Sequence, residues 1–216
     1  MKKPLIGALA AVLILAGAAG ATTLGGGVGW TKATAEHGEE SSLEERAWVF
    51  DGNVDLGLLR LGGSYLMLMD EKENPQADYT MYAGGVELRL PLGPLPLKAY
   101  VGGGYTGEDL SFGSAKIEGE GFFVGGRALA DLDGVLLEGY YQHSPRFSWV
   151  ETTDGGEVEG EAVMARYGAS LRFPVLWPLN IVIGYKGGTL EPGDDYQGEL
   201  KKVQTNVFTA GGAISF

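Results

Sequence analysis

The chain of 216 residues contains no cysteine, so neither disulfides nor a cysteine-attached lipid can stabilise or anchor it. It has only two histidines, His37 and His143, which leaves few candidates for acid–base catalysis. Lysine and arginine are also scarce, 16 against 28 acidic residues, for a net charge of −12. A nucleic-acid-binding protein shows a basic face, so this balance argues against nucleic acid as a partner.

Long hydrophobic runs are missing after the first residues of the chain. Lys2 and Lys3 precede an apolar stretch, Leu5–Leu15, and the small residues Ala19-Gly20-Ala21 follow it. This order is typical of a secretion signal, and the stretch is shorter than the about 20 residues of a spanning helix. We therefore predict a signal peptide over 1–21 and a mature β-barrel domain over 22–216.

What the mature region does contain is alternation of apolar and polar residues with a period of two, which predicts β-strands. Near the end of the chain, for example, Phe208, Ile214 and Phe216 share one face, and Thr205, Thr209 and Ser215 share the other. The 37 glycines follow no three-residue period, so a collagen-like chain is excluded. We interpret the glycine runs as positions of close strand packing and curvature.

The connectors between the alternating segments predict ten strands, of which the second and third are the least clearly bounded. Leu56–Leu61 offers no evident turn residue, whereas Asp51-Gly52-Asn53 is a good tight-turn sequence. If residues 22–53 form something other than a hairpin, the barrel has eight strands instead. The predicted strands are residues 23–35, 45–57, 60–70, 79–90, 97–107, 117–131, 135–150, 161–173, 180–190 and 200–216.

Short and long connectors alternate along the chain. The short ones are rich in proline, glycine or aspartate, as in 91–96, 131–134 and 174–178; the long ones are acidic, as in 107–120 and 151–161. Short turns at one rim and long loops at the other are typical of a bacterial transmembrane barrel. The predicted fold class is therefore an all-β, transmembrane, antiparallel up-and-down barrel with short periplasmic turns and longer acidic extracellular loops.

Charged residues of both signs occur on the polar faces of several predicted strands. In a soluble sandwich, which is the alternative fold, they would be solvated on an outer face. In a narrow membrane barrel they would point inward, pair with one another and fill the lumen. The predicted lumen charges are Glu87, Arg89, Lys98, Arg127, Glu138, Arg166, Arg172 and Lys186.

Aromatic residues near the ends of the predicted strands are expected to form two girdles at headgroup level. They are Trp30, Trp48, Tyr79, Tyr82, Tyr105, Phe147, Trp149, Trp177 and Phe216.

The signal, the alternating strands and the final run from Phe208 to Phe216 resemble those of small bacterial outer-membrane barrels of the OmpA/OmpX type. The resemblance covers the whole mature chain and implies integration into the cell outer membrane. It also implies that Phe208, Ile214 and Phe216 form the signal read by the barrel-assembly machinery. Ala210 and Gly212 depart from this pattern, because they are smaller than the residues usual at these positions.

Neither histidine lies in a convincing catalytic arrangement. His143 and Ser144 invite comparison with outer-membrane lipid hydrolases, but adjacent strand residues point to opposite faces, so a hydrogen bond between them is not expected. His37 lies among acidic residues with no fixed ligand spacing. Clustered loop carboxylates, with Glu39, Glu40, Asp194 and Asp195 as candidate ligands, are suited to Ca²⁺ or Mg²⁺ and could bridge the loops to anionic glycolipids.

These observations favour a monomeric structural or surface-interaction barrel with a plugged, charged lumen, in contact with outer-membrane lipids or glycolipids. A narrow pore is the alternative, and a lipid- or peptide-modifying enzyme is a weaker one. No catalytic residue is assigned.

Overall fold

The computed structural model describes residues 21–37, 39–69, 77–93, 96–112, 115–153, 155–194, 196 and 200–216. The described chain forms strands, turns and irregular segments, and no helix in it is long and apolar enough to cross a membrane. The strands are β1 (Ala21–His37), β2 (Glu39–Asp55), β3 (Leu59–Leu68), β4 (Ala77–Leu90), β5 (Leu97–Phe112), β6 (Ala115–Leu132), β7 (Val135–Thr153), β8 (Gly156–Leu176), β9 (Leu179–Pro192) and β10 (Leu200–Ser215).

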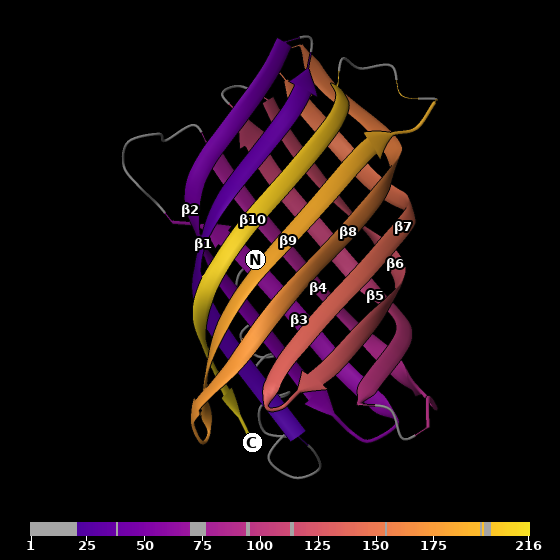
Figure 1. Cartoon of the computed structure of the whole chain (residues 1–216). Coiled ribbons are helices and arrows are strands. Elements are labelled where there is room, and N and C mark those ends of the chain that lie inside the picture. The colour runs from indigo at the N-terminus through magenta and orange to yellow at the C-terminus, as the bar shows by residue number, and fades with distance from the viewer. Residues whose placement is uncertain are drawn as a thin grey trace, which may run out of the picture.

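The ten strands close into one antiparallel barrel, in which each strand pairs with the next and β10 returns to β1 (Figure 1). The closing pair runs from Thr23 opposite Ser215 to His37 opposite Leu200. Two further backbone bonds, from the Thr22 amide to the Phe216 carbonyl and from the Phe216 amide to the Thr22 carbonyl, extend this seam. The predicted up-and-down topology and the count of ten strands are confirmed, and the alternative of eight is wrong.

The turn between β2 and β3 lies within Leu56–Leu61, the stretch in which the sequence showed no evident turn residue. Asp51, Gly52 and Asn53 lie inside β2 and pair with β3. The chain reverses at Leu56–Leu58 instead, where Gly57 has a φ of 84° and its amide donates to Asp55 Oδ1 at 3.0 Å. A positive φ is easy for glycine, so a single glycine between two leucines is enough to form this turn.

The described short connectors, around residues 56–58, 91–93, 133–134 and 177–178, share one end of the barrel with Phe216, which we call the turn end. At the opposite, loop end the strands extend further than the sequence predicted. Most of the expected loops 107–120 and 151–161 belong to two long hairpins, β5–β6 and β7–β8. Glu118 and Glu120, and likewise Glu157, Glu159 and Glu161, occupy every second position of a strand, so these stretches resembled polar loops.

The outer wall of the barrel is apolar. Its large side chains are among the most exposed in the molecule, including Phe122 at 75%, Val124 at 62% and Phe208 at 63%. A contiguous exposed surface of this kind is unusual for a soluble monomer and is the lipid-facing band of a transmembrane barrel. Further outward-facing residues are Val28, Trp30, Trp48, Phe50, Val86, Leu88, Val101, Leu137, Ile181, Ile183 and Ile214.

Three of the expected girdle aromatics point into the barrel. Tyr79, Phe147 and Trp149 are 0–2% exposed and pack in a buried apolar cluster at the loop end. A bulge in β7 shifts the register between Ser144 and Phe147, so even-numbered residues face inward before it and odd-numbered residues after it. Trp30, Trp48, Tyr105, Trp177 and Phe216 are exposed, as a girdle requires.

Candidate functional site

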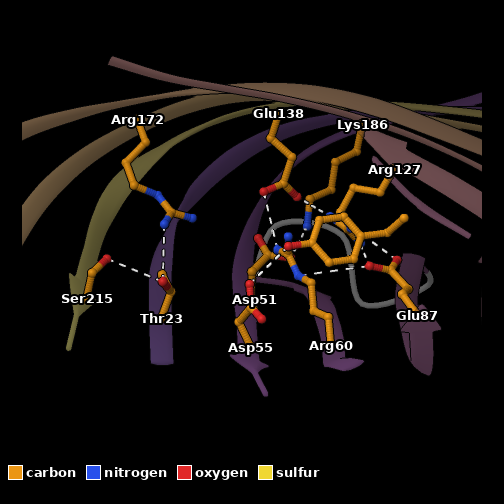
Figure 2. Close-up of polar contacts among 11 residues, drawn as sticks. Thr23, Asp51, Asp55, Arg60, Glu87, Arg127, Glu138, Arg172, Lys186 and Ser215 are labelled. Carbon is orange, nitrogen blue, oxygen red and sulfur yellow. Dashed lines mark hydrogen bonds and ion pairs between the residues drawn. The ribbon is translucent and has the colours of Figure 1, made fainter. Parts of the chain in front are cut away.

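Two arginines and two glutamates from four strands interlock inside the turn half of the barrel. Arg127 Nε on β6 donates to both carboxylate oxygens of Glu87 on β4 at 3.0 Å, and its Nη1 donates to Glu138 on β7. Arg60 Nη2 on β3 donates to Glu138 at 3.4 Å, and Arg60 Nε lies 3.9 Å from Glu87. Figure 2 shows this charge network (Arg60, Glu87, Arg127, Glu138), in which two positive and two negative groups alternate.

Aromatic rings and a second ion pair support the charge network. Tyr100 donates to Asp55 Oδ2 at 2.9 Å, and its ring lies 5.5 Å from the Arg60 guanidinium. The guanidinium of Arg127 lies 5.3 Å from the ring of Tyr140. These stacked cations keep their attraction because they are largely shielded from water. Beside them, Lys186 Nζ on β9 lies 2.6 Å from Asp51 Oδ1 on β2.

Arg172 on β8 occupies a different part of the lumen, near the closing seam. Its Nη1 donates to Thr23 Oγ1 on β1 at 3.2 Å, and this hydroxyl lies 3.3 Å from Ser215 Oγ on β10. Asn180 Nδ2 on β9 donates to the same serine oxygen at 3.2 Å. In Figure 2 Arg172, Thr23 and Ser215 therefore form a group of their own, apart from the charge network.

These polar groups line part of a cavity of about 130 Å³ inside the barrel. Its wall includes short stretches of glycine from neighbouring strands, among them Gly25–Gly27, Gly62–Gly63, Gly84–Gly85 and Gly211–Gly212. Interior positions of a small barrel are normally filled by side chains, and glycine leaves that space empty. The cavity is large enough for several water molecules or one small ligand.

The loop half of the lumen is filled mainly by apolar side chains, with Thr31, Glu151 and Thr205 buried among them. Along β4, for example, the inward-facing residues run from Tyr79 and Met81 at the loop end, past Ala83 and Gly85, to Glu87 near the turn end. The apolar plug comprises Ala33, Ala35, Leu43, Ala47, Val49, Leu66, Leu68, Tyr79, Met81, Leu110, Ile117, Phe147, Trp149, Ala162, Met164, Leu190, Leu200, Val203 and Val207.

A buried ion pair lies between the apolar plug and the cavity. Arg166 Nη2 on β8 donates to Glu108 Oε2 on β5 at 3.0 Å, and the two side chains are only 4% and 9% exposed. Arg166 Nη1 also donates to the Thr106 hydroxyl and, at 3.3 Å, to the Tyr82 carbonyl. These bonds compensate for burying the charge.

The structure brings Glu87, Arg127 and Glu138 together in the charge network and places Arg166, Arg172 and Lys186 elsewhere in the lumen. Arg89 and Lys98 are exposed at the turn end, so they do not join it. Both continue the inward-facing alternation of their strands. However, each lies within two residues of a strand end at the rim, and alternation predicts the face of a residue but not its depth.

Several residues of the lumen escaped the sequence analysis. Arg60 and Asp51 lie in the two predicted strands that were the least clearly bounded, so their inward-facing positions were not recognised. Asp55, Tyr100 and Glu108 carry the same signal as the predicted residues, a polar side chain on the inward face of a strand. Glu108 was instead assigned to a loop.

The observed geometry of His143 and Ser144 agrees with the expectation from strand alternation. Ser144 is fully buried, and its hydroxyl donates to the Phe122 carbonyl at 2.7 Å rather than to a histidine. His143 pairs with Val124 and Ala165, whose side chains are on the outer wall.

The candidate metal ligands are only partly covered by the described residues. The side chains of His37, Glu39 and Glu40, and Asp195 altogether, lie outside them, and Asp194 is exposed. No group of three or more potential metal-ligating side chains gathers in the described part of the chain. Binding of Ca²⁺ or Mg²⁺ at the loops stays a prediction, as does the signal peptide, which lies outside the described residues up to residue 20.

No protein-family model and no curated protein sequence matches the chain. Among solved structures, neisserial surface protein A is 16% identical, with 91% of this chain and 99% of that one aligned at a TM-score of 0.43. The attachment invasion locus protein Ail of Yersinia pestis is 12% identical (92% and 99%, TM-score 0.40). The translocator domain of the autotransporter NalP from Neisseria meningitidis is also 12% identical (98% and 95%, TM-score 0.45). The closed barrel itself confirms the resemblance to small outer-membrane β-barrels.

Proposed function

We propose that the chain is an integral outer-membrane barrel with a structural or surface-interaction role, and that its lumen is closed to the passage of ions and solutes. The observation that carries this proposal is the apolar plug. Leu66, Tyr79, Leu110, Phe147 and Trp149 are each 2% exposed or less. They come from different sides of the barrel and meet in one cluster.

An open pore needs a continuous polar path. The polar cavity and the charge network occupy only the turn half of the lumen, and the apolar plug separates them from the loop end. An ion crossing the plug would lose most of its hydration and meet few polar groups, chiefly Thr31, Glu151 and Thr205, which costs several kcal/mol or more. The geometry thus favours a closed barrel over the narrow pore.

Planar bilayers test this directly. The purified folded protein is expected to give no steady single-channel openings. A positive control is the variant Leu66→Ala/Phe147→Ala/Met164→Ala, which shortens three plug residues and should produce openings if the plug is the barrier. Steady openings of the wild-type protein that change in size or ion selectivity in Arg89→Gln, Lys98→Gln or Arg172→Gln would establish the pore instead.

An enzymatic role finds no support in the geometry of the described residues. The Ser144 hydroxyl faces the lumen and donates to a carbonyl, and His143 lies on the other face of the same strand. We therefore propose no catalytic residue. Hydrolysis of a glycolipid or peptide that disappears in His143→Ala would contradict this.

The seam between β1 and β10 bears on how the barrel assembles. The Phe216 side chain is 63% exposed, while its backbone pairs with Thr22. Phe208 and Ile214 lie on the same outer face. An exposed terminal ring is accessible to an assembly factor before it meets lipid.

Deletion of Phe216 is expected to leave export intact and to reduce insertion into the outer membrane, because the exposed ring is needed for recognition. The measurement is the fraction of signal-cleaved protein that shows heat-modifiable migration on denaturing gels. Phe216→Ala keeps the backbone pair with Thr22, so it should reduce insertion as deletion does. Normal insertion of Phe216→Ala would assign the effect to backbone pairing rather than to the ring.

A further inference from the structure

The charges that line the cavity do not balance. Five cationic side chains, Arg60, Arg127, Arg166, Arg172 and Lys186, contribute to its wall. Only three carboxylates do, and these are Asp51, Glu87 and Glu138.

Four of the five cations have an acidic partner. Arg60 and Arg127 share Glu87 and Glu138, Lys186 pairs with Asp51, and Arg166 pairs with Glu108, which lies outside the cavity wall. Arg172 has no carboxylate within 4.0 Å among the described residues. It is therefore the cation of the cavity whose charge is left without a direct counter-ion.

The guanidinium of Arg172 has one terminal nitrogen that no described residue uses. Its Nη1 donates to Thr23, and its Nε is covered by neighbouring atoms and has no hydrogen-bond partner. No hydrogen bond from Nη2 to a described residue occurs. Nη2 is therefore the nitrogen from which Arg172 can donate a charge-assisted hydrogen bond to an oxygen of a ligand in the cavity.

We propose that Arg172 forms a binding site for a small oxyanion in the lumen cavity, with an oxygen of the ligand on Nη2. Burying a charge without a partner is costly, and an anion at this position removes that cost. The cavity volume of about 130 Å³ admits a ligand the size of acetate or inorganic phosphate.

Arg172 lies on the turn-end side of the apolar plug. Its partner Thr23 lies near the start of β1, and Thr23 contacts Ser215, the last residue of β10. Anion binding at Arg172 therefore does not require the barrel to conduct.

Side-chain NMR of arginine-labelled protein folded in detergent tests the site. Sodium acetate and inorganic phosphate are titrated separately at constant ionic strength, and the Arg172 Nε–H signal is identified by its loss in Arg172→Gln. A saturable shift of that signal with either probe is expected, and the probe that saturates at lower concentration indicates whether carboxylate or phosphate is preferred. No saturable shift with either probe would overturn the proposal.

Thermal unfolding gives a second readout that does not depend on NMR assignment. A ligand that binds only the folded state raises the unfolding midpoint, and the rise increases with ligand concentration and with affinity. Arg172→Gln removes the charge and should weaken binding about tenfold or more, since charge-assisted bonds are the strong ones. Arg172→Lys keeps the charge on a shorter side chain and should bind with an affinity between those of the wild-type protein and Arg172→Gln.

Lys116→Gln is the matched control, because it removes a cation from an exposed ion pair with Glu118 far from the cavity. It should respond to both probes like the wild-type protein. An equal rise of the midpoint in the wild-type protein and Arg172→Gln would show general salt stabilisation and overturn the proposal.

Discussion

Replacement of Arg127 by methionine is expected to lower the free energy of unfolding by about 3–5 kcal/mol, the usual effect of removing one partner from a buried ion pair. Arg127 contacts both glutamates of the charge network, and all three side chains are only 13–16% exposed. Without it, Glu87 and Glu138 share a single guanidinium, that of Arg60. Two carboxylates facing one cation in a poorly hydrated lumen repel each other.

The measurement is urea unfolding of the folded barrel in detergent, followed by tryptophan fluorescence. The control Lys116→Met breaks an exposed pair whose side chains are 48% and 49% exposed, and should cost less than about 1 kcal/mol. The double variant Arg127→Met/Glu138→Gln restores equal numbers of cations and carboxylates and should recover part of the loss. If Arg127→Met and Lys116→Met cost the same, the charge network contributes no special stability.

This network also shows how far the sequence can predict the interior of a barrel. Alternation correctly assigned Glu87, Arg127 and Glu138 to the lumen, because a period of two fixes the face of every residue in a regular strand. Which charges pair depends on strand register and on depth. Register is set by turns, and the strands on either side of Gly57 were the least clearly bounded, so Arg60, the fourth member of the charge network, was missed.

Two other features were missed for different reasons. The β7 bulge exchanges the inner and outer faces. Pro145 lies in this bulge and is a local signal for it, but the alternation was continued through it, so Phe147 and Trp149 were assigned to the lipid side. The division of the lumen into an apolar plug and a polar cavity depends on which inward-facing residues lie at the same level along the barrel axis. Such neighbours are distant in the sequence, as Tyr79 and Phe147 are.

The glycines of the cavity wall differ sharply in how much space surrounds them. Gly25 and Gly27 are both inward-facing residues of β1, two positions apart. A Cβ on Gly25 would lie 3.5 Å from Ala213 Cβ and 3.6 Å from the Gly212 carbonyl oxygen, which is ordinary contact. A Cβ on Gly27 would lie 2.5 Å from the Ala210 carbonyl oxygen and 2.8 Å from Gly211 Cα. These obstacles are backbone atoms of β10, so a rotamer change cannot relieve the clash.

Gly27→Ala is therefore expected to push β1 and β10 apart at the closing seam and to destabilise the barrel by about 1–3 kcal/mol or more, the range for overpacking. Gly25→Ala should be neutral or should stabilise it by up to about 1 kcal/mol, because alanine loses less conformational freedom on folding than glycine. Urea unfolding in detergent measures both, and the heat-modifiable fraction in isolated membranes reports assembly. The two substitutions add the same methyl group to the same face of one strand. The difference between their unfolding free energies therefore measures the effect of the close contact between β1 and β10 at Gly27. Equal stability of the two variants would mean that β1 and β10 can separate at Gly27 without cost.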